Sequence, residues 1–535
     1  MSGRLAPRWP ERASFVIPSL IAVAGAALLI LQWQWGRMLW LDEEMIAINL
    51  RDRSFTQLAG QLTLGQAAPY GWLVAERAIL LTFGPDERAL RAIPLLFGIA
   101  LLIVAAWIGH RWMTPAGATT LVFLCAAGQW ISFHALELKH YSADSCFGLL
   151  IPALAVWAIE EDRVLTWWIV AAVAQWFSNG ALFVVPVCAL VVLKAQRGIA
   201  SRSGVAIWLV SFGLNFIANL GPARSNDFLN QYWANAFPPR GSNGLVILEW
   251  LAAQLSPLAL KPAGSGFGVW FWAVAVAGFI LAIRRAPSIR LVFALIPISG
   301  LMFAAIRLVP MFERLALWMI PAAYVGVAFA ADASVERIIR VRSEHRSLDA
   351  ALGLTGCLVL LVILTDVARR GTTYLALTEP KANHEVDDRA AVRWLARQAR
   401  PGAVWITTHN ALPAVWWYAN DNLPALESTV EQDGQSCGSS ELGETLRRDG
   451  PTRALVYLGF SHKVPPSFDD TLLMRLGSLG QITAYNRFGE SSHALVVDLR
   501  EPPTGRVTLA LLGATDDAGP ADVSGCITVS PARRW

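Results

Sequence analysis

Long runs of apolar residues alternate with short polar breaks along the chain up to about residue 370. A helix needs roughly 17 to 25 mostly apolar residues to cross the hydrocarbon core of a bilayer, so the pattern predicts about eleven membrane-spanning helices. They are expected near 14–34, 91–109, 117–135, 145–159, 164–178, 180–193, 204–220, 267–283, 289–308, 315–331 and 349–367.

Two of these apolar runs have more than one interpretation. The N-terminal run follows several arginines, as a signal peptide does, but it continues to Trp35 and is too long for the apolar region of one. We therefore expect an uncleaved span. The run 164–193 is interrupted at Ser178-Asn179-Gly180, which predicts two short spans joined by a tight turn.

Composition supports a membrane protein. Hydrophobic residues make up 55% of the chain and charged residues only 16%, whereas soluble proteins carry about 25% charged residues. The 23 tryptophans suit membrane–water interfaces, where the indole ring is buried and its N–H stays wet. The net charge of +4 is small and there is no basic tract, so nothing indicates a nucleic-acid partner.

Lysine and arginine in the short loops predict the orientation, because such loops tend to stay in the cytoplasm. With the N-terminus inside, strict alternation places the basic loops at 110–111, 160–163, 194–202, 284–290 and 337–346 inside as well. The same alternation places 36–90, 134–144, 221–266, 309–314 and everything after about 370 on the extracytoplasmic side.

The composition changes near Asp366, and residues 370–535 hold no further apolar span. Their pattern predicts an extracytoplasmic α/β domain that follows an all-α polytopic domain at 1–369. Helices are expected at 387–399 and 439–450, and strands at 403–409, 453–460, 481–488 and 493–500.

Three further expectations concern the extracytoplasmic parts. Cys437 and Cys526 share the C-terminal domain, where oxidation is possible, and we expect a disulfide between them. The apolar spacing at 55–62 predicts a helix lying on the membrane surface. The aromatic residues Trp394, Trp405, Trp416, Trp417 and Tyr418 suit either sugar stacking or a core, and the core is favoured.

Acids and bases gather at the extracytoplasmic ends of four spans. Each group has an ordinary alternative, such as solvated acids, an interfacial ion pair or a snorkelling cation. Together they could hold a phosphate with Arg or Lys and activate a hydroxyl with a carboxylate. The groups are Asp42, Glu43 and Glu44 after the first span, Glu137, Lys139, His140, Tyr141 and Asp144 within 134–144, Arg91 at the second span, and Glu313 with Arg314 at the tenth.

These motifs occur in an order that resembles the GT-C membrane glycosyltransferases. The acids after the first span are followed by "QAAPYGWLVAERAILLTFGPDERALRAIPLLFG", "LELKHYSADSCFGLL" and "ERLALWMIP". The likeness covers 1–370 and is strongest to the branch of protein mannosyltransferases and lipid A aminoarabinose transferases (glycosyltransferase family 39). Each motif alone is weak, but the ordered set is fairly specific.

The resemblance implies a polyprenyl-phosphate sugar donor and an acceptor hydroxyl on an envelope glycan, lipid or protein. Asp42 or Glu43 matches the catalytic acid of the family, and Glu137 matches its second acid. Arg91 and Lys139 match residues that bind the donor phosphate in the family, although the family often has Arg at the position of Lys139. Arg314 and Tyr141 are further candidates for this role. A divalent metal ion between Asp42 and Glu137 is permitted but not required.

The sequence therefore predicts an inverting glycosyltransferase in the bacterial inner (plasma) membrane, with a carboxylate of the first loop as general base. A transporter or flippase of lipid-linked sugars is the alternative. Against it, the chain has no detectable inverted repeat, and its charges cluster at span ends rather than at mid-membrane. The sequence names neither the sugar nor the acceptor.

Overall fold

The protein is described by a computed structural model that covers residues 15–283, 291–344, 347–372, 386–400, 403–408, 411–419, 452–459, 480–489, 492–499 and 527–530. The chain forms two compact units. The helical unit comprises Met1–Gly36 and Leu50–Glu379, and the C-terminal unit comprises Arg37–Asn49 and Pro380–Trp535. The predicted disulfide between Cys437 and Cys526 lies outside the described residues.

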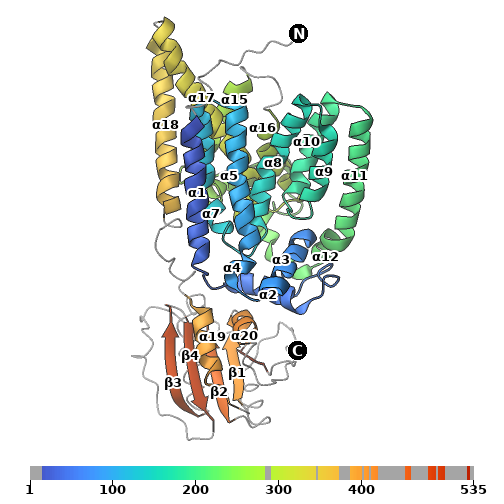
Figure 1. Ribbon diagram of the computed structural model, residues 1–535, viewed down its shortest axis with the longest axis vertical. Coiled ribbons are helices and arrows are strands. Elements are labelled where there is room, and N and C mark those ends of the chain that lie inside the picture. The colour runs from blue at the N-terminus through green and yellow to red at the C-terminus, as the bar shows by residue number, and fades with distance from the viewer. Residues whose placement is uncertain are drawn as a thin grey trace. The chain divides into compact units, whose positions relative to one another are not determined.

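The helical unit contains a helix within each of the eleven predicted spans (Figure 1), so the predicted polytopic helical fold is confirmed. Within the described residues, six segments are long and apolar enough to cross a membrane: Val16–Gln34, Ala92–Trp112, Tyr141–Glu160, Ile199–Arg224, Glu313–Ile339 and Asp349–Thr372. The corresponding helices are α1 (Val16–Gln34), α5 (Ala92–Trp112), α8 (Tyr141–Glu160), α11 (Ile199–Asn215), α17 (Ile320–Glu344) and α18 (Ser347–Thr372).

Shorter helices complete this unit. The apolar ones are α6 (Pro115–Ala127), α9 (Val164–Ala174), α10 (Ala181–Ala195), α14 (Gly244–Leu260), α15 (Val269–Ile283) and α16 (Leu291–Ala305). The remaining ones are α3 (Tyr70–Phe83), α4 (Glu87–Leu90), α7 (Gln129–His134), α12 (Gly221–Arg224) and α13 (Asp227–Tyr232). A continuous helix, α2 (Leu41–Asp52), begins in the C-terminal unit and ends in the helical unit.

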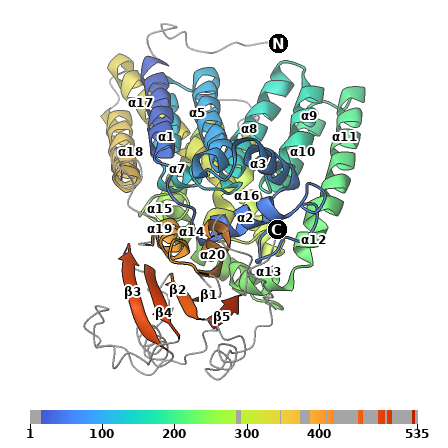
Figure 2. The ribbon, with the colours of Figure 1, turned by 60° about the horizontal axis from the view of Figure 1, so that its bottom comes forward.

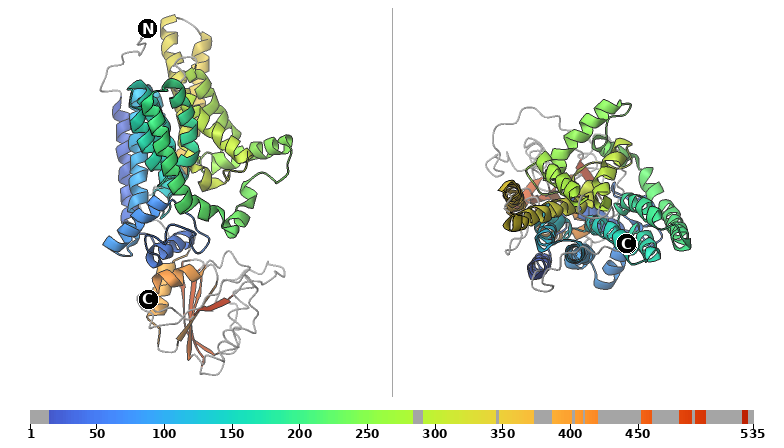
Figure 3. Two further views of the ribbon diagram at one scale, coloured as in Figure 1. Left: turned by 90° about the vertical axis from the view of Figure 1, so that its right-hand side faces the viewer. Right: turned by 90° about the horizontal axis from the view of Figure 1, so that it is seen from above.

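The structure differs from the sequence expectation at three places. The run 117–135 is broken at Gly128, whose extended backbone separates α6 from α7. Residues 55–58 form turns instead of the expected surface helix. The loop 221–266 contains the apolar helix α14, which runs across the direction of the long helices (Figure 3, left). Periodicity alone did not identify these features, because short apolar stretches fit several structures.

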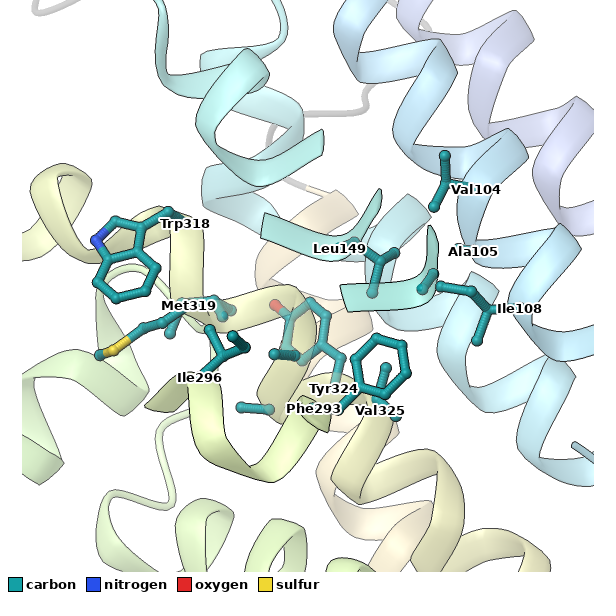
Figure 4. Packing of buried hydrophobic residues seen from close by; sticks show 14 of the residues in the cluster. Val104, Ala105, Ile108, Leu149, Phe293, Ile296, Trp318, Met319, Tyr324 and Val325 are labelled. Carbon is teal, nitrogen blue, oxygen red and sulfur yellow. The ribbon is translucent and has the colours of Figure 1, made fainter. Parts of the chain in front are cut away.

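The core of the helical unit lies where α5, α8, α16 and α17 meet. Figure 4 shows Tyr324 and Val325 of α17 near Phe293 of α16, with Leu149 of α8 beside them. Alanine is frequent in this core, and its small side chain allows the helices to approach closely. The hydroxyl of Tyr324 donates a hydrogen bond to the carbonyl of Ala263 (2.9 Å), so this buried polar group is satisfied.

One close approach yields a stability prediction. A Cβ atom at Gly278 of α15 would lie 1.8 Å from the carbonyl oxygen of Gly326 in α17. We expect Gly278→Ala to separate these helices and to cost about 1–3 kcal/mol or more, which is the range for overpacked cores. The control is Gly213→Ala in α11, where an added Cβ atom would meet nothing within 4 Å beyond the adjoining backbone of its own helix, so alanine should be neutral or stabilising. Thermal unfolding in detergent measures both, and equal melting temperatures would contradict the packing.

The C-terminal unit contains a five-stranded sheet of order β3-β4-β2-β1-β5 (Figure 2). Its strands are β1 (Ala403–Thr408), β2 (Arg453–Leu458), β3 (Gln481–Phe488), β4 (Ser492–Asp498) and β5 (Ile527–Ser530). Only β1 and β2 pair in parallel, and the other neighbours are antiparallel. The central strands β2 and β4 are buried along almost their whole length, which explains their unbroken apolar sequence.

Two helices pack on this sheet, α19 (Asp388–Ala396) against β2, β3 and β4, and α20 (Leu412–Tyr418) against β1. The side chain of Asp387 accepts a hydrogen bond from the backbone N–H of Ala390 and caps α19. Trp405, Trp417 and Tyr418 are buried, in keeping with the favoured core role, whereas Trp394 and Trp416 are only partly buried. The sequence predicted α19 and β1 to β4, whereas α20 and the short strand β5 were missed. The helix expected at 439–450 lies outside the described residues.

Candidate active site

The candidate site begins where α7 ends and α8 starts. Glycine at 128 breaks the preceding helix, and the chain makes tight turns from Ala135 to His140 before Tyr141 opens α8. Polar side chains in this turn are almost completely buried. Glu137 is 0% exposed and Lys139 is 4% exposed. Buried charges are retained in proteins only where they are paired or bind a ligand. This turn is therefore a candidate for ligand binding or catalysis.

Glu137 lies among basic side chains from two parts of the chain. Its Oε2 lies 2.5 Å from Nδ1 of His134, one helical turn earlier. Burial alone raises the pKa of Glu137, but the charges of His134, Arg314 and Lys139 outweigh burial and lower it. The carboxylate is therefore ionised at neutral pH.

Arg314 reaches this turn from the 3₁₀ helix Glu313–Met319. Its guanidinium carbon lies 5.9 Å from the ring centre of Tyr141 and 5.9 Å from that of Trp233. The side chain of Arg314 is half-buried. A guanidinium between two aromatic rings and beside a carboxylate is fixed in direction, which prepares it for an anionic ligand.

Lys139 and His140 continue the site toward α3 and α10. Nζ of Lys139 donates a hydrogen bond to Oε1 of Gln66 (2.6 Å). Burial and the charge of Lys139 lower the pKa of His140 to about 3, so its imidazole is neutral. Nε2 of His140 lies 3.2 Å from Nδ2 of Asn179. Asp144 accepts hydrogen bonds from the hydroxyl of Ser178 (2.6 Å) and the backbone N–H of Gly180 (2.9 Å). Its carboxyl group therefore stabilises the turn before α10.

The structure thus brings Glu137, Lys139, Tyr141 and Arg314 together, although Arg314 is distant in sequence. Arg91 is buried at the junction of α4 and α5. Its neighbourhood includes the end of α1, because Nε1 of Trp33 donates to the carbonyl of Arg88 (2.7 Å).

The three acids of the first loop belong to the C-terminal unit. They occupy the first turn of α2, where negative charge is favoured by the helix dipole. Oε2 of Glu43 accepts a hydrogen bond from the backbone N–H of Trp40 (3.2 Å), so Glu43 caps the helix. Glu43 and Glu44 are fully buried, whereas Asp42 is partly exposed. Asp42 is therefore the acid of this trio most accessible to a substrate.

Sequence reasoning did not single out His134, Gln66 or Lys261. The i, i+3 spacing of His134 and Glu137 was the only available signal. Lys261 lies over the ring of Trp130 (5.0 Å) and pairs with Glu313 (3.5 Å). Gln66 begins one of the motifs that carry the family resemblance, but its contact with Lys139 is made only in the tertiary structure. Nothing in the sequence near Lys261 marks that residue.

No group of three or more His, Cys, Asp or Glu side chains is arranged to hold a metal ion within the described ranges. The predicted pairing of Asp42 with Glu137 on a metal stays a prediction, since the two acids lie in different units.

Among solved structures, there are proteins whose fold is similar to that of this chain. No family model and no curated protein matches the sequence. The structure is similar to that of ArnT from Cupriavidus metallidurans in the apo state, with a TM-score of 0.51 and 14% identity. It is also similar to the same protein bound to undecaprenyl phosphate, with a TM-score of 0.53 and 15% identity. Each comparison covers 89% of this chain and 97% of the ArnT chain.

The chain has the ArnT fold. At this level of identity the similarity establishes the arrangement of helices and the additional C-terminal domain, in agreement with the GT-C resemblance of the motifs. One fold can host different activities, so the activity of this protein depends on the residues of its site.

Proposed function

We propose that the protein is an integral membrane glycosyltransferase that moves a sugar from a polyprenyl-phosphate donor to an acceptor hydroxyl. The observation that carries this proposal is the cluster of Glu137, Lys139 and Arg314 in the helical unit, in which Glu137 and Lys139 are buried and Arg314 is half-buried. Two fixed cations beside one carboxylate can bind a phosphate monoanion or dianion. The ArnT structure with bound undecaprenyl phosphate gives a precedent for such a ligand on this fold.

In the proposed reaction the acceptor oxygen attacks the anomeric carbon from the face opposite the phosphate. A carbon–oxygen bond to the acceptor forms, and the bond between the anomeric carbon and the phosphate oxygen breaks, with inversion. Asp42 takes the hydroxyl proton as general base, and Glu43 is the second candidate. Lys139, Arg91 and Arg314 stabilise the departing polyprenyl phosphate, and Tyr141 fixes the orientation of Arg314.

Glu137 has a supporting role in this mechanism. Its carboxylate neutralises the cationic cluster before the donor arrives and keeps His134 and Arg314 oriented. Neutral His140 adds no further positive charge. The cluster can therefore exist without a ligand and still attract one, because the Glu137 carboxylate balances only part of the cationic charge.

The proposed location is the bacterial inner membrane, with the N-terminus in the cytoplasm and the C-terminal unit outside. The acceptor is a hydroxyl of an envelope glycan, lipid or protein. Within the helical unit, the ends of α5 and α8 lie together, since Arg111 pairs with Glu160 (3.1 Å). Both helix ends border loops whose charged residues predict a cytoplasmic location, which agrees with the proposed orientation in the membrane.

An assay with two donor types tests the proposal. We expect the purified protein to transfer sugar from a polyprenyl-phosphate sugar and to ignore nucleotide sugars, because a lipid phosphate can reach the buried cations from the bilayer. Product is identified by mass spectrometry over a panel of hydroxyl acceptors. Turnover with a nucleotide sugar alone would overturn the proposal. Movement of lipid-linked sugar between vesicle leaflets without transfer would favour the transporter.

A further inference from the structure

Lys261 forms an ion pair with the residue that directly precedes Arg314. It follows α14, and its Nζ lies 3.5 Å from Oε1 of Glu313. The same ammonium group lies over the ring of Trp130 from α7, 5.0 Å from the ring centre. The side chains of Lys261 and Glu313 are 44% and 36% exposed. Lys261 therefore connects α7 to the start of the segment that carries Arg314.

The backbone that follows Lys261 is fastened to two neighbouring helices. The hydroxyl of Tyr324 in α17 donates a hydrogen bond to the carbonyl of Ala263 (2.9 Å). The backbone N–H of Gly266 donates to Oδ2 of Asp366 in α18 (2.6 Å). These bonds fix the connection between α14 and α15, so the side chain of Lys261 starts from a defined position.

Glu313 has an unusual backbone conformation. Its φ is 25°, and residues other than glycine adopt positive φ only where their surroundings hold them there. Glu313 begins the 3₁₀ helix, and Arg314 is its next residue. The far end of this helix is packed tightly, because a Cβ atom at Gly148 of α8 would lie 1.9 Å from the carbonyl oxygen of Trp318. The ion pair with Lys261 holds the near end.

The direction of the Arg314 side chain depends on this helix start. Its guanidinium carbon lies 5.9 Å from the ring centres of Tyr141 and Trp233, and its charge acts on Glu137. A backbone rotation at the preceding residue would move the long side chain away from these partners. The carboxylate of Glu313 itself repels an anion, so its place next to an anion-binding arginine is better explained by the conformation that it holds.

We propose that Lys261 and Glu313 are positioning residues: their ion pair holds the start of the 3₁₀ helix and so aims the guanidinium of Arg314 at the donor phosphate. They act on the phosphate through Arg314 and not by direct contact. The effect on lipid binding rests on the proposed function, whereas the effect on the conformation of the helix start does not.

One substitution separates positioning from a simple effect of charge. If Glu313 acted only through its charge, Glu313→Gln would strengthen the binding of an anionic lipid. If Glu313 positions Arg314, the same substitution weakens binding, although a negative charge has been removed. Lys261→Met should weaken binding by a similar factor. The double variant should lose no more than either single variant, because all three lose the same pair.

Binding of undecaprenyl phosphate to the full-length protein in detergent measures these effects. We expect the affinity to fall by about two- to fivefold in each of the three variants, the range that a partly exposed ion pair can supply. Lys261→Arg should restore the affinity to the wild-type value, because it keeps the charge. A Glu313→Gln protein that binds more tightly, or losses that add in the double variant, would overturn the proposal.

Arg369→Met is the matched control. Arg369 is also a partly exposed basic residue, but it pairs with Asp366 (3.6 Å) and not with the 3₁₀ helix. It should keep the wild-type affinity for undecaprenyl phosphate. An equal loss of affinity in Arg369→Met and Lys261→Met would show a general effect of positive charge and would overturn the positioning role.

Amide hydrogen exchange of the same variants without lipid forms a separate arm. Protection of the segment 313–319 should fall in Lys261→Met and Glu313→Gln and stay unchanged in Arg369→Met. Unchanged protection in the first two variants, or wild-type affinity beside lowered protection, would overturn the proposal. If the wild type bound no undecaprenyl phosphate but the variants exchanged as expected, the proposed donor site would be rejected and the held helix start would stand.

Discussion

Replacing Asp42 by Asn is expected to lower the rate of sugar transfer by about 10²–10⁴-fold, the usual contribution of a general base. Asparagine has the same shape but cannot accept the hydroxyl proton. Asp42 is partly exposed in the first turn of α2, so stability should change by no more than about 0.5 kcal/mol. Initial rates with a polyprenyl-phosphate sugar, together with a melting curve, measure both effects.

Glu43→Gln separates the two candidate bases. Glutamine retains the hydrogen bond to the N–H of Trp40, so the helix start is preserved while the negative charge is lost. We expect Glu43→Gln to keep most of the transfer rate. Loss of transfer in Glu43→Gln but not in Asp42→Asn would assign the base to Glu43 instead. Full activity in both variants would reject a base in the first loop.

Replacing Lys139 by Gln is expected to reduce transfer by about 10²–10³-fold, in line with the loss of one fixed charge that stabilises a leaving group. Lys139 is almost fully buried, and its charge acts directly on Glu137 and His140. Both kcat and the affinity for the lipid-linked donor should fall, because the cation interacts with the phosphate before and during bond cleavage. Steady-state kinetics and direct binding of a polyprenyl phosphate measure the two effects.

Gln66→Leu is the matched control for Lys139. It removes the hydrogen bond between Nζ of Lys139 and Oε1 of Gln66 but leaves the charge in place. We expect a smaller loss of transfer, within about tenfold, which corresponds to about 1.4 kcal/mol. Equal losses in Lys139→Gln and Gln66→Leu, with matching falls in melting temperature, would show that Lys139 acts through structure and not through the donor phosphate.

The sequence determined the helical runs of the membrane domain and most of the C-terminal elements. Apolar runs of span length have few folded alternatives, because an unpaired backbone is too costly in hydrocarbon. The strands β2 and β4 were also recognisable, since an unbroken apolar stretch of this length suits a strand buried on both faces. Likewise, the buried ionisable residues of 134–144 were marked as unusual by their position beside spans.

Only the tertiary structure decided which charges act on one another. The pairing of Glu137 with His134 is local, but Arg314 reaches Glu137 from a distant segment, and Gln66 approaches Lys139 from the first loop. The three acids of that loop are adjacent in sequence, yet they differ in environment: Asp42 is partly exposed, Glu43 caps α2, and Glu44 is fully buried. The physical reason is that periodicity reports local structure, whereas burial and charge pairing depend on segments that meet only after folding.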